Sequence, residues 1–118
     1  MDINRIIAKI RNHPESERIG MIATHLGIVR GNSRNGREVS GIEVVCNHEI
    51  LNDIINETKS LPGIVDVIAE FNEGALKIGD IIMFVAIGGD VRDNVFPALS
   101  KTVERIKKDG SRKKEFFV

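Results

Sequence analysis

Apolar residues along this chain alternate between the spacing of a helix and the continuous runs of a strand, and proline or glycine separates the segments. Spacing at i, i+3, i+4 and i+7 predicts three helices. The first follows Asp2, the second spans residues 48–61, and the third begins near Asp93 or Asn94. Runs rich in Ile, Val and Ala predict four strands at 19–29, 42–46, 64–71 and 81–87. This order predicts a single α+β domain over residues 1–118, with a mainly antiparallel sheet.

The predicted helices end at breaks made by proline or glycine: His13-Pro14, Pro62-Gly63 and Asp109-Gly110. The last helix contains Pro97, which is tolerated when it lies in or near the first turn. Segment 30–41 is a polar loop in which Asn35-Gly36 is a strong turn signal. Hairpin pairing of the strands that flank this loop is therefore one interpretation. Segment 72–80 is expected to be a turn.

Composition excludes several classes of protein. Lys plus Arg and Asp plus Glu both number 17, whereas a general nucleic-acid-binding protein should be clearly basic. No apolar run approaches the roughly 20 residues of a membrane-spanning helix, and the first 20 residues lack the features of a signal peptide. The single cysteine, Cys46, cannot form an internal disulfide, so we expect a cytoplasmic protein. From its charge and hydropathy, we expect it to bind neither nucleic acid nor a membrane.

Charge is balanced in total but not along the chain. Residues 48–80 carry seven acids and two lysines, whereas residues 101–118 carry seven bases and three acids. The basic C-terminal segment is therefore a candidate anion-binding region, and a solvated helix face followed by a solubilising tail is the alternative interpretation.

Common catalytic and metal-binding motifs are missing. The three histidines, His13, His25 and His48, show no paired spacing, so we predict no metal site, and no glycine-rich nucleotide-binding motif occurs. Cys46 falls inside a predicted strand, where a small buried thiol is expected rather than a nucleophile. His25 also falls in a strand, and a partly buried structural histidine is the alternative to a binding role.

Positive charges at the junctions between elements are the most informative feature. Arg30 follows the first strand, Arg92 precedes the last helix, and Lys107 lies near the end of that helix. Lys113 or Lys114 follows the turn at Gly110. If these side chains converge on one cleft, they would bind phosphate or carboxylate, or stabilise the oxyanion of an acyl transfer.

Several segments, in order and over about residues 3–115, resemble the large, catalytic subunit of molybdopterin synthase. Residues 24–31 (THLGIVRG) are similar to a family motif that ends Gly-Thr-Val-Arg-Gly, and residues 71–80 (FNEGALKIGD) resemble a family turn between strands. Arg92 and Phe96 match an arginine and a phenylalanine at the start of the last helix. The segments 105–107 (RIK) and 113–115 (KKE) match Arg-Leu-Lys and Lys-Lys-Glu.

The resemblance implies an α/β-hammerhead domain that forms a homodimer and docks a small ubiquitin-like sulfur carrier on each subunit. The Gly-Gly thiocarboxylate at the carrier's C-terminus would sulfurate cyclic pyranopterin monophosphate twice, forming the dithiolene of molybdopterin without a metal or organic cofactor. Lys107 would be the main catalytic lysine, and Lys113 or Lys114 the second, so that residues 109–118 contribute to the active site. Arg30 and Arg92 would bind the substrate's phosphate, one of them across the dimer interface.

The chain departs from the family pattern at several places, three of which bear on the site. Val91 stands where the family has histidine, His25 replaces a phenylalanine and is a candidate substrate-binding residue, and residues 109–112 replace an aromatic stretch. Two functions therefore remain open: an active, divergent sulfurtransferase, or a catalytically impaired paralogue that binds the carrier as a scaffold. A small anion-binding or RNA-binding domain is a third, more distant alternative.

Overall fold

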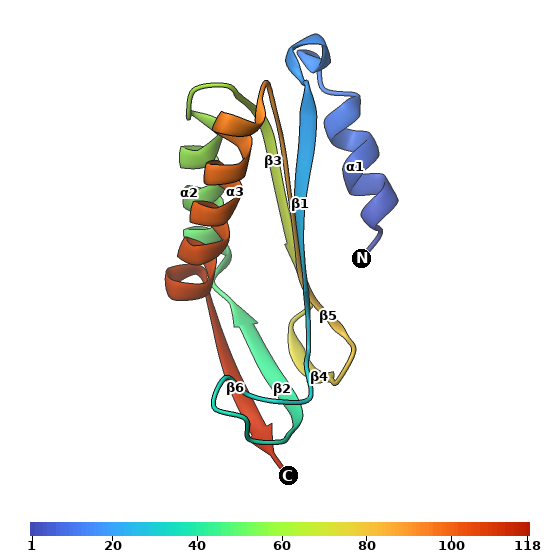
Figure 1. Cartoon of the computed structure of the whole chain (residues 1–118), viewed down its shortest axis with the longest axis vertical. Coiled ribbons are helices and arrows are strands. Elements are labelled where there is room, and N and C mark those ends of the chain that lie inside the picture. The colour runs from blue at the N-terminus through green and yellow to red at the C-terminus, as the bar shows by residue number, and fades with distance from the viewer.

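Two three-stranded antiparallel sheets form the framework of the protein, and the computed structural model describes all of its residues, 1–118. The first sheet has the order β1 (Met21–Ile28), β5 (Ile81–Gly89), β3 (Ile64–Phe71). The second has the order β4 (Gly74–Lys77), β2 (Val39–Cys46), β6 (Ser111–Phe117). The second sheet extends beyond one end of the first, so the molecule is elongated and measures 49 × 25 × 25 Å (Figure 1).

Helices cover both faces of the first sheet. Helices α2 (His48–Lys59) and α3 (Arg92–Arg105) lie side by side on one face, and α1 (Ile3–Arg11) lies on the other (Figure 1). Strand β5 is buried on both faces because its side chains alternate between two apolar cores. Val85 and Ile87 belong to the larger core with α2 and α3, whereas Phe84 and Ala86 pack with residues of α1. A third, smaller core lies in the second sheet and contains Val29, Val39, Ile42 and Val44.

The three helices and the α+β class are confirmed, and local signals explain where the helices begin. The Asp2 carboxylate accepts a hydrogen bond of 3.1 Å from the Arg5 backbone N–H and caps α1. The Asn47 side chain caps α2 in the same way. Helix α3 begins at Arg92, slightly before the predicted start, so Pro97 lies inside the helix.

Hairpin pairing of β1 with β2 is wrong. Strand β1 pairs only with β5, and β2 pairs with β4 and β6. Asn35-Gly36 does form a turn, in which Gly36 has a φ of 85°. The turn is local, because it is closed by a β-bridge between Asn32 and Glu38 and does not pair β1 with β2. Beyond this turn β2 enters the second sheet, where its apolar side chains have their own core.

Two strands were not predicted from the sequence. Strand β4 lies within the segment predicted to be a turn, and β6 lies in the segment predicted to be a basic tail. Both are edge strands of the second sheet with mostly exposed side chains, so their sequences lack a clear apolar alternation. A π-helical turn, Ile106–Gly110, connects α3 to β6. None of the helices has both the length and the apolar character needed to span a bilayer.

Candidate functional site

A pocket of about 660 Å³ lies where the two sheets meet beside the end of α3. It is lined by residues at the end of β1, in the following loop, on β2 and β6, and by Lys107 of the π-helical turn. Apolar side chains from β2, β3 and β5 also contribute: Ile42, Val44, Phe71, Ile82 and Met83. Four predicted site residues, His25, Arg30, Lys107 and Lys113, line this one pocket.

The end of β1 delivers His25 and Arg30 to the pocket. His25 pairs with Val85, and Gly27 pairs with Met83, so both residues lie on the sheet face that α2 and α3 cover. The register shifts after Gly27, and the Val29 backbone N–H then donates to the Asp80 carbonyl over 2.9 Å. Because Val29 is buried in the small core, the next residue, Arg30, is fixed at the pocket.

The π-helical turn places Lys107. Ile106 is completely buried, and Gly110 packs against it and against Ile54 of α2. The Ser111 hydroxyl donates to the Ile106 carbonyl over 3.2 Å, and the Asn47 N–H donates to the Gly110 carbonyl over 2.8 Å. Anchored at both ends, the turn directs the chain from α3 into β6, with Lys107 exposed at the pocket.

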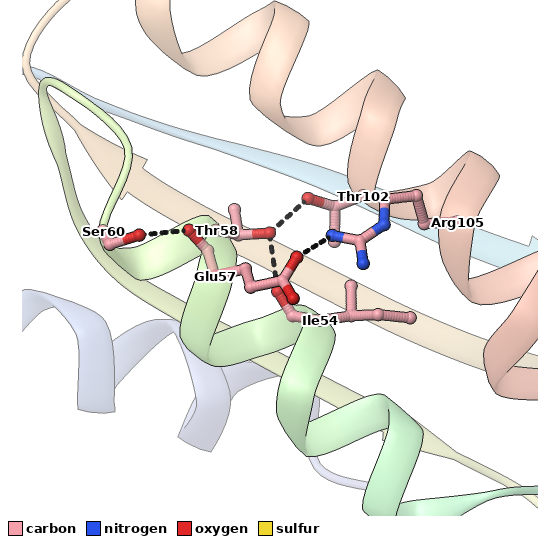
Figure 2. Close-up of polar contacts among 6 residues, drawn as sticks. All are labelled: Ile54, Glu57, Thr58, Ser60, Thr102 and Arg105. Carbon is pink, nitrogen blue, oxygen red and sulfur yellow. Dashed lines mark hydrogen bonds and ion pairs between the residues drawn. The ribbon is translucent and has the colours of Figure 1, made fainter.

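Contacts between α2 and α3 hold the helix end that precedes this turn (Figure 2). Arg105 donates to the Glu57 carboxylate over 2.6 Å, two residues before Lys107. One turn earlier, the buried hydroxyls of Thr58 and Thr102 lie 2.9 Å apart, and Thr58 also donates to the Ile54 carbonyl. The Arg105–Glu57 and Thr58–Thr102 contacts in Figure 2 therefore fix α3 against α2 close to the pocket.

The register of β6 separates the two candidate second lysines. Lys113 pairs with Val44 of β2, which is buried and lines the pocket. Lys114 pairs with the exposed Glu43, and its ammonium lies 5.6 Å from the centroid of the Phe116 ring. Because successive strand residues point to opposite faces, Lys113 shares the pocket with Lys107 and Lys114 does not.

Arg92 lies away from this pocket, at the other end of α3. At a rise of about 1.5 Å per residue, the helix places Arg92 about 20 Å from Lys107. The Asp90 carboxylate lies just before this end of the helix, where it accepts from the Val91 N–H over 2.6 Å and from the Asn94 side-chain amide over 2.9 Å. These hydrogen bonds lower the pKa of Asp90.

The pocket concentrates positive charge in a chain whose net charge is zero. Its charged residues are five cations and one acid: Arg30, Arg34, Lys107, Arg112, Lys113 and Glu115. None of these cations takes part in an ion pair, since the four ion pairs of the chain lie elsewhere. Unpaired cations around a partly enclosed space favour an anionic ligand.

Sequence reasoning did not single out Arg34, Arg112 or Glu115 as site residues. Arg34 belongs to a loop with three arginines, and the other two belong to the basic C-terminal segment, so a charge signal was present. The pairing of β6 with β2, which brings these segments to one pocket, has no local signal.

His25 is the unusual member of the pocket. Its Nε2 atom is buried and has no hydrogen-bond partner. Burial, and secondarily the nearby Lys107 ammonium, lower the pKa of His25 below its ordinary value of 6.5. Both causes favour the neutral imidazole over the charged one. Elsewhere in the chain, no three His, Cys, Asp or Glu side chains are grouped so that they could hold a metal ion.

Comparison with known proteins places the chain in a family. Residues 1–109 match the model of the MoaE protein family. The solved structure of molybdopterin cofactor biosynthesis protein E from Burkholderia multivorans ATCC 17616 is 28% identical, with a TM-score of 0.77; the match covers 100% of this chain and 84% of that one. The molybdopterin synthase from Staphylococcus aureus is 25% identical, with a TM-score of 0.73, over 86% of this chain and 77% of that one.

A more distant structure shares the fold. The complex of subunits 1 and 2 of the molybdopterin-converting factor from Helicobacter pylori 26695 contains a chain that is 16% identical, with a TM-score of 0.73, over 99% of this chain and 80% of that one. No curated protein matches this chain in a comparison of sequences. Since the family model spans nearly the whole chain and the solved structures agree with the fold, the chain belongs to the MoaE protein family.

Proposed function

We propose that this chain is the large subunit of a molybdopterin synthase, and that its pocket transfers sulfur from a thiocarboxylated carrier to cyclic pyranopterin monophosphate. Membership in the MoaE family supports a role in molybdenum cofactor biosynthesis. The observation that carries the proposal for this pocket is the convergence of Arg30, Lys107 and Lys113, without any ion-pair partner.

Each cation has a chemical task in this reaction. A cyclic phosphate and a thiocarboxylate are both anions, and attack on an acyl carbon develops a negative charge on its oxygen. Lys107, fixed by the anchored π-helical turn, stabilises that oxyanion next to the thiocarboxylate. Lys113 is the second lysine, and Arg30, which lines the same pocket, binds the phosphate. None of these steps calls for a metal or an organic cofactor.

A small protein partner is part of the proposal. The Helicobacter pylori complex of two molybdopterin-converting factor subunits supports pairing of this fold with a small subunit. The partner would be a ubiquitin-like carrier whose C-terminal Gly-Gly thiocarboxylate enters the pocket. Arg92 lies too far from Lys107 to share a site within one chain, so it binds substrate in the pocket of a second copy, in a homodimer.

The test compares two adjacent lysines of the same turn. Lys107 lines the pocket, whereas Lys108 is exposed and does not. With thiocarboxylated carrier and cyclic pyranopterin monophosphate, Lys107→Ala is expected to lower molybdopterin formation at least about 100-fold, the usual scale for losing an oxyanion donor. Lys108→Ala should retain the wild-type rate, and both should melt like wild type. Equal rates for the two variants would contradict the proposal.

A scaffold function is the alternative, and Val91 favours it. Val91 is exposed at the N-cap of α3 and makes no side-chain capping bond, at the position where the resemblance has histidine. A scaffold would bind the carrier as tightly as an enzyme does but form no product from it. Measuring carrier binding beside product formation therefore separates the two functions.

A further inference from the structure

The pocket contains one polar atom that the fold itself leaves unused. Nε2 of His25 is buried without a partner, although the ring lines the pocket. A Cβ atom built on Gly27 would lie 3.6 Å from this nitrogen, so the ring packs over the glycine. Since an unpartnered buried polar group destabilises a fold, such an atom in a pocket calls for a ligand or a chemical role.

Burial, and secondarily the positive charges around His25, favour its uncharged form. Arg30 and Arg34 line the pocket from the end of β1 and its loop, Lys107 from the π-helical turn, and Arg112, Lys113 and Glu115 from β6. The lining residues of β2, β3 and β5 are apolar. Five cations against one acid favour the neutral imidazole, and the lowered pKa of His25 agrees with this arrangement.

Few groups in the pocket can accept a proton at neutral pH. Lysine and arginine side chains are already protonated, so they can only donate. His25 and Glu115 remain, and a carboxylate is ordinarily the weaker base of the two. The Lys107 ammonium is close enough to His25 to affect its pKa.

The proposed sulfur transfer requires a proton acceptor at one step. When the thiocarboxylate sulfur bonds to a pterin side-chain carbon, a C–O bond of that carbon breaks and the oxygen leaves with the phosphate or as water. The sulfur is then still attached to the acyl carbon of the carrier, as a thioester. Water must add to that carbon, which forms a C–O bond and releases a proton. The C–S bond then breaks, sulfur leaves on the pterin as a thiolate, and the carrier is released with a C-terminal carboxylate.

Resting on this proposed function, we propose that His25 is the general base of thioester hydrolysis and that its Nε2 takes the proton of the attacking water. The proton passes from the imidazolium to solvent, and the second proton of the water dissociates from the new carboxylic acid. The ring carries its own proton on Nδ1 in this role. Lys107 acts beside it on the developing oxyanion, so the base and the oxyanion donor are separate groups. Because Nε2 is buried, neighbouring side chains move aside to admit the water in this role.

The experiment uses His25→Phe, which keeps an aromatic ring and removes the nitrogen. In a single turnover with thiocarboxylated carrier and cyclic pyranopterin monophosphate, the variant is expected to form product about 100-fold or more slowly than wild type, the typical scale for general base catalysis. Intact-mass spectrometry should detect a carrier–pterin thioester that accumulates in the variant and not in wild type. Carrier affinity should stay within about twofold, and the variant should melt no lower than wild type, because an unpartnered polar atom has been removed.

Two further measurements make the result decisive. Wild-type turnover should decline with falling pH below 6.5, and the residual turnover of His25→Phe should lack that decline. His25→Gln repeats the test with a polar side chain in case the aromatic variant folds poorly, and Glu115→Gln tests the other possible proton acceptor of the pocket. His48→Gln, at a histidine outside the pocket, is the matched control that should hydrolyse the thioester normally.

Normal turnover by both His25 variants, or thioester accumulation in Glu115→Gln instead, would overturn the role of His25 and leave the proposed function standing. A wild-type protein that forms no molybdopterin would overturn the proposed function and this role with it.

Discussion

At the scale of single residues, the direction of a side chain decides its function more than its charge does. Lys113 and Lys114 are adjacent and chemically identical, yet the strand turns one toward the pocket and the other toward Glu43. Sequence resemblance left both open as the second lysine. The choice required the β6 register, which depends on a partner strand about 70 residues earlier in the chain.

This difference gives a matched pair of variants. Lys113→Ala is expected to lower kcat/KM at least about 10-fold, because a charge next to the reacting groups is lost. Lys114→Ala should change kcat/KM less than about twofold, since it removes only an exposed contact with Phe116. Steady-state kinetics of both variants check this, and a larger effect at Lys114 would reverse the assignment.

Glu73 gives a residue-scale prediction for pH. Its carboxylate accepts from the Cys46 N–H over 2.7 Å and lies 2.9 Å from His48 Nε2, and these contacts lower the pKa of Glu73 from 4.5. A depressed carboxyl pKa stabilises the fold above the unfolded-state pKa, and this stability is lost as the pH falls through the folded-state pKa. Glu73→Gln should therefore be less stable than wild type at pH 7, and the gap should close on acidification. Urea unfolding at several pH values measures the gap, and a constant gap would refute the linkage.

At the scale of elements, local pattern was sufficient for those elements that bury a regular apolar face. The three helices and the strands of the first sheet were predicted because Ile, Leu and Val recur at helical or strand spacing. Strand β6, with the sequence SRKKEFF, has no such face, and only its pairing with β2 makes it a strand. The wrong hairpin had the opposite cause, since a correct local turn signal did not determine which strands pair.

The contact between α2 and α3 can be tested through its hydroxyl pair. Thr58 still has the Ile54 carbonyl as partner when Thr102 is lost, whereas Thr102 has no other partner than Thr58. Thr102→Val should therefore reduce the free energy of unfolding by about 1 kcal/mol, and Thr58→Val by more, about 1–3 kcal/mol, because it leaves a buried hydroxyl unpaired. Chemical denaturation of both variants and of the double variant, which should lose less than the sum, provides the measurement. Equal losses would show that the pair is not buried as described.

At the scale of the whole molecule, the pocket exists because two sheets meet beside the end of one helix. Residues 25–34 and 107–115 come together only there, so their charges could be noted in the sequence but not assembled into one site. The resemblance supplied candidate residues, whereas their convergence and the separation of Arg92 are properties of the tertiary structure.

The distance between Arg92 and Lys107 leads to a complementation experiment. Arg92→Ala and Lys107→Ala should each be inactive in isolation. Mixed and reassembled, they should recover up to about a quarter of wild-type activity, because half of the dimers are hybrids and each hybrid has one intact pocket. A mixture that stays inactive would show that Arg92 acts in the same chain as Lys107 or that the protein is not a dimer, and an active Arg92→Ala variant would place Arg92 outside the active site.

The central claim is that this pocket moves sulfur from a carrier to a pterin, and the stoichiometry of one reaction tests it most directly. Purified protein, thiocarboxylated carrier and cyclic pyranopterin monophosphate are combined, and carrier consumption is measured by mass while molybdopterin is followed as its fluorescent oxidation product. The proposed reaction predicts two carriers converted to the carboxylate for each molybdopterin formed, with no conversion in Lys107→Ala. Carrier that stays thiocarboxylated while bound to the wild-type protein would contradict sulfur transfer and leave only the scaffold function.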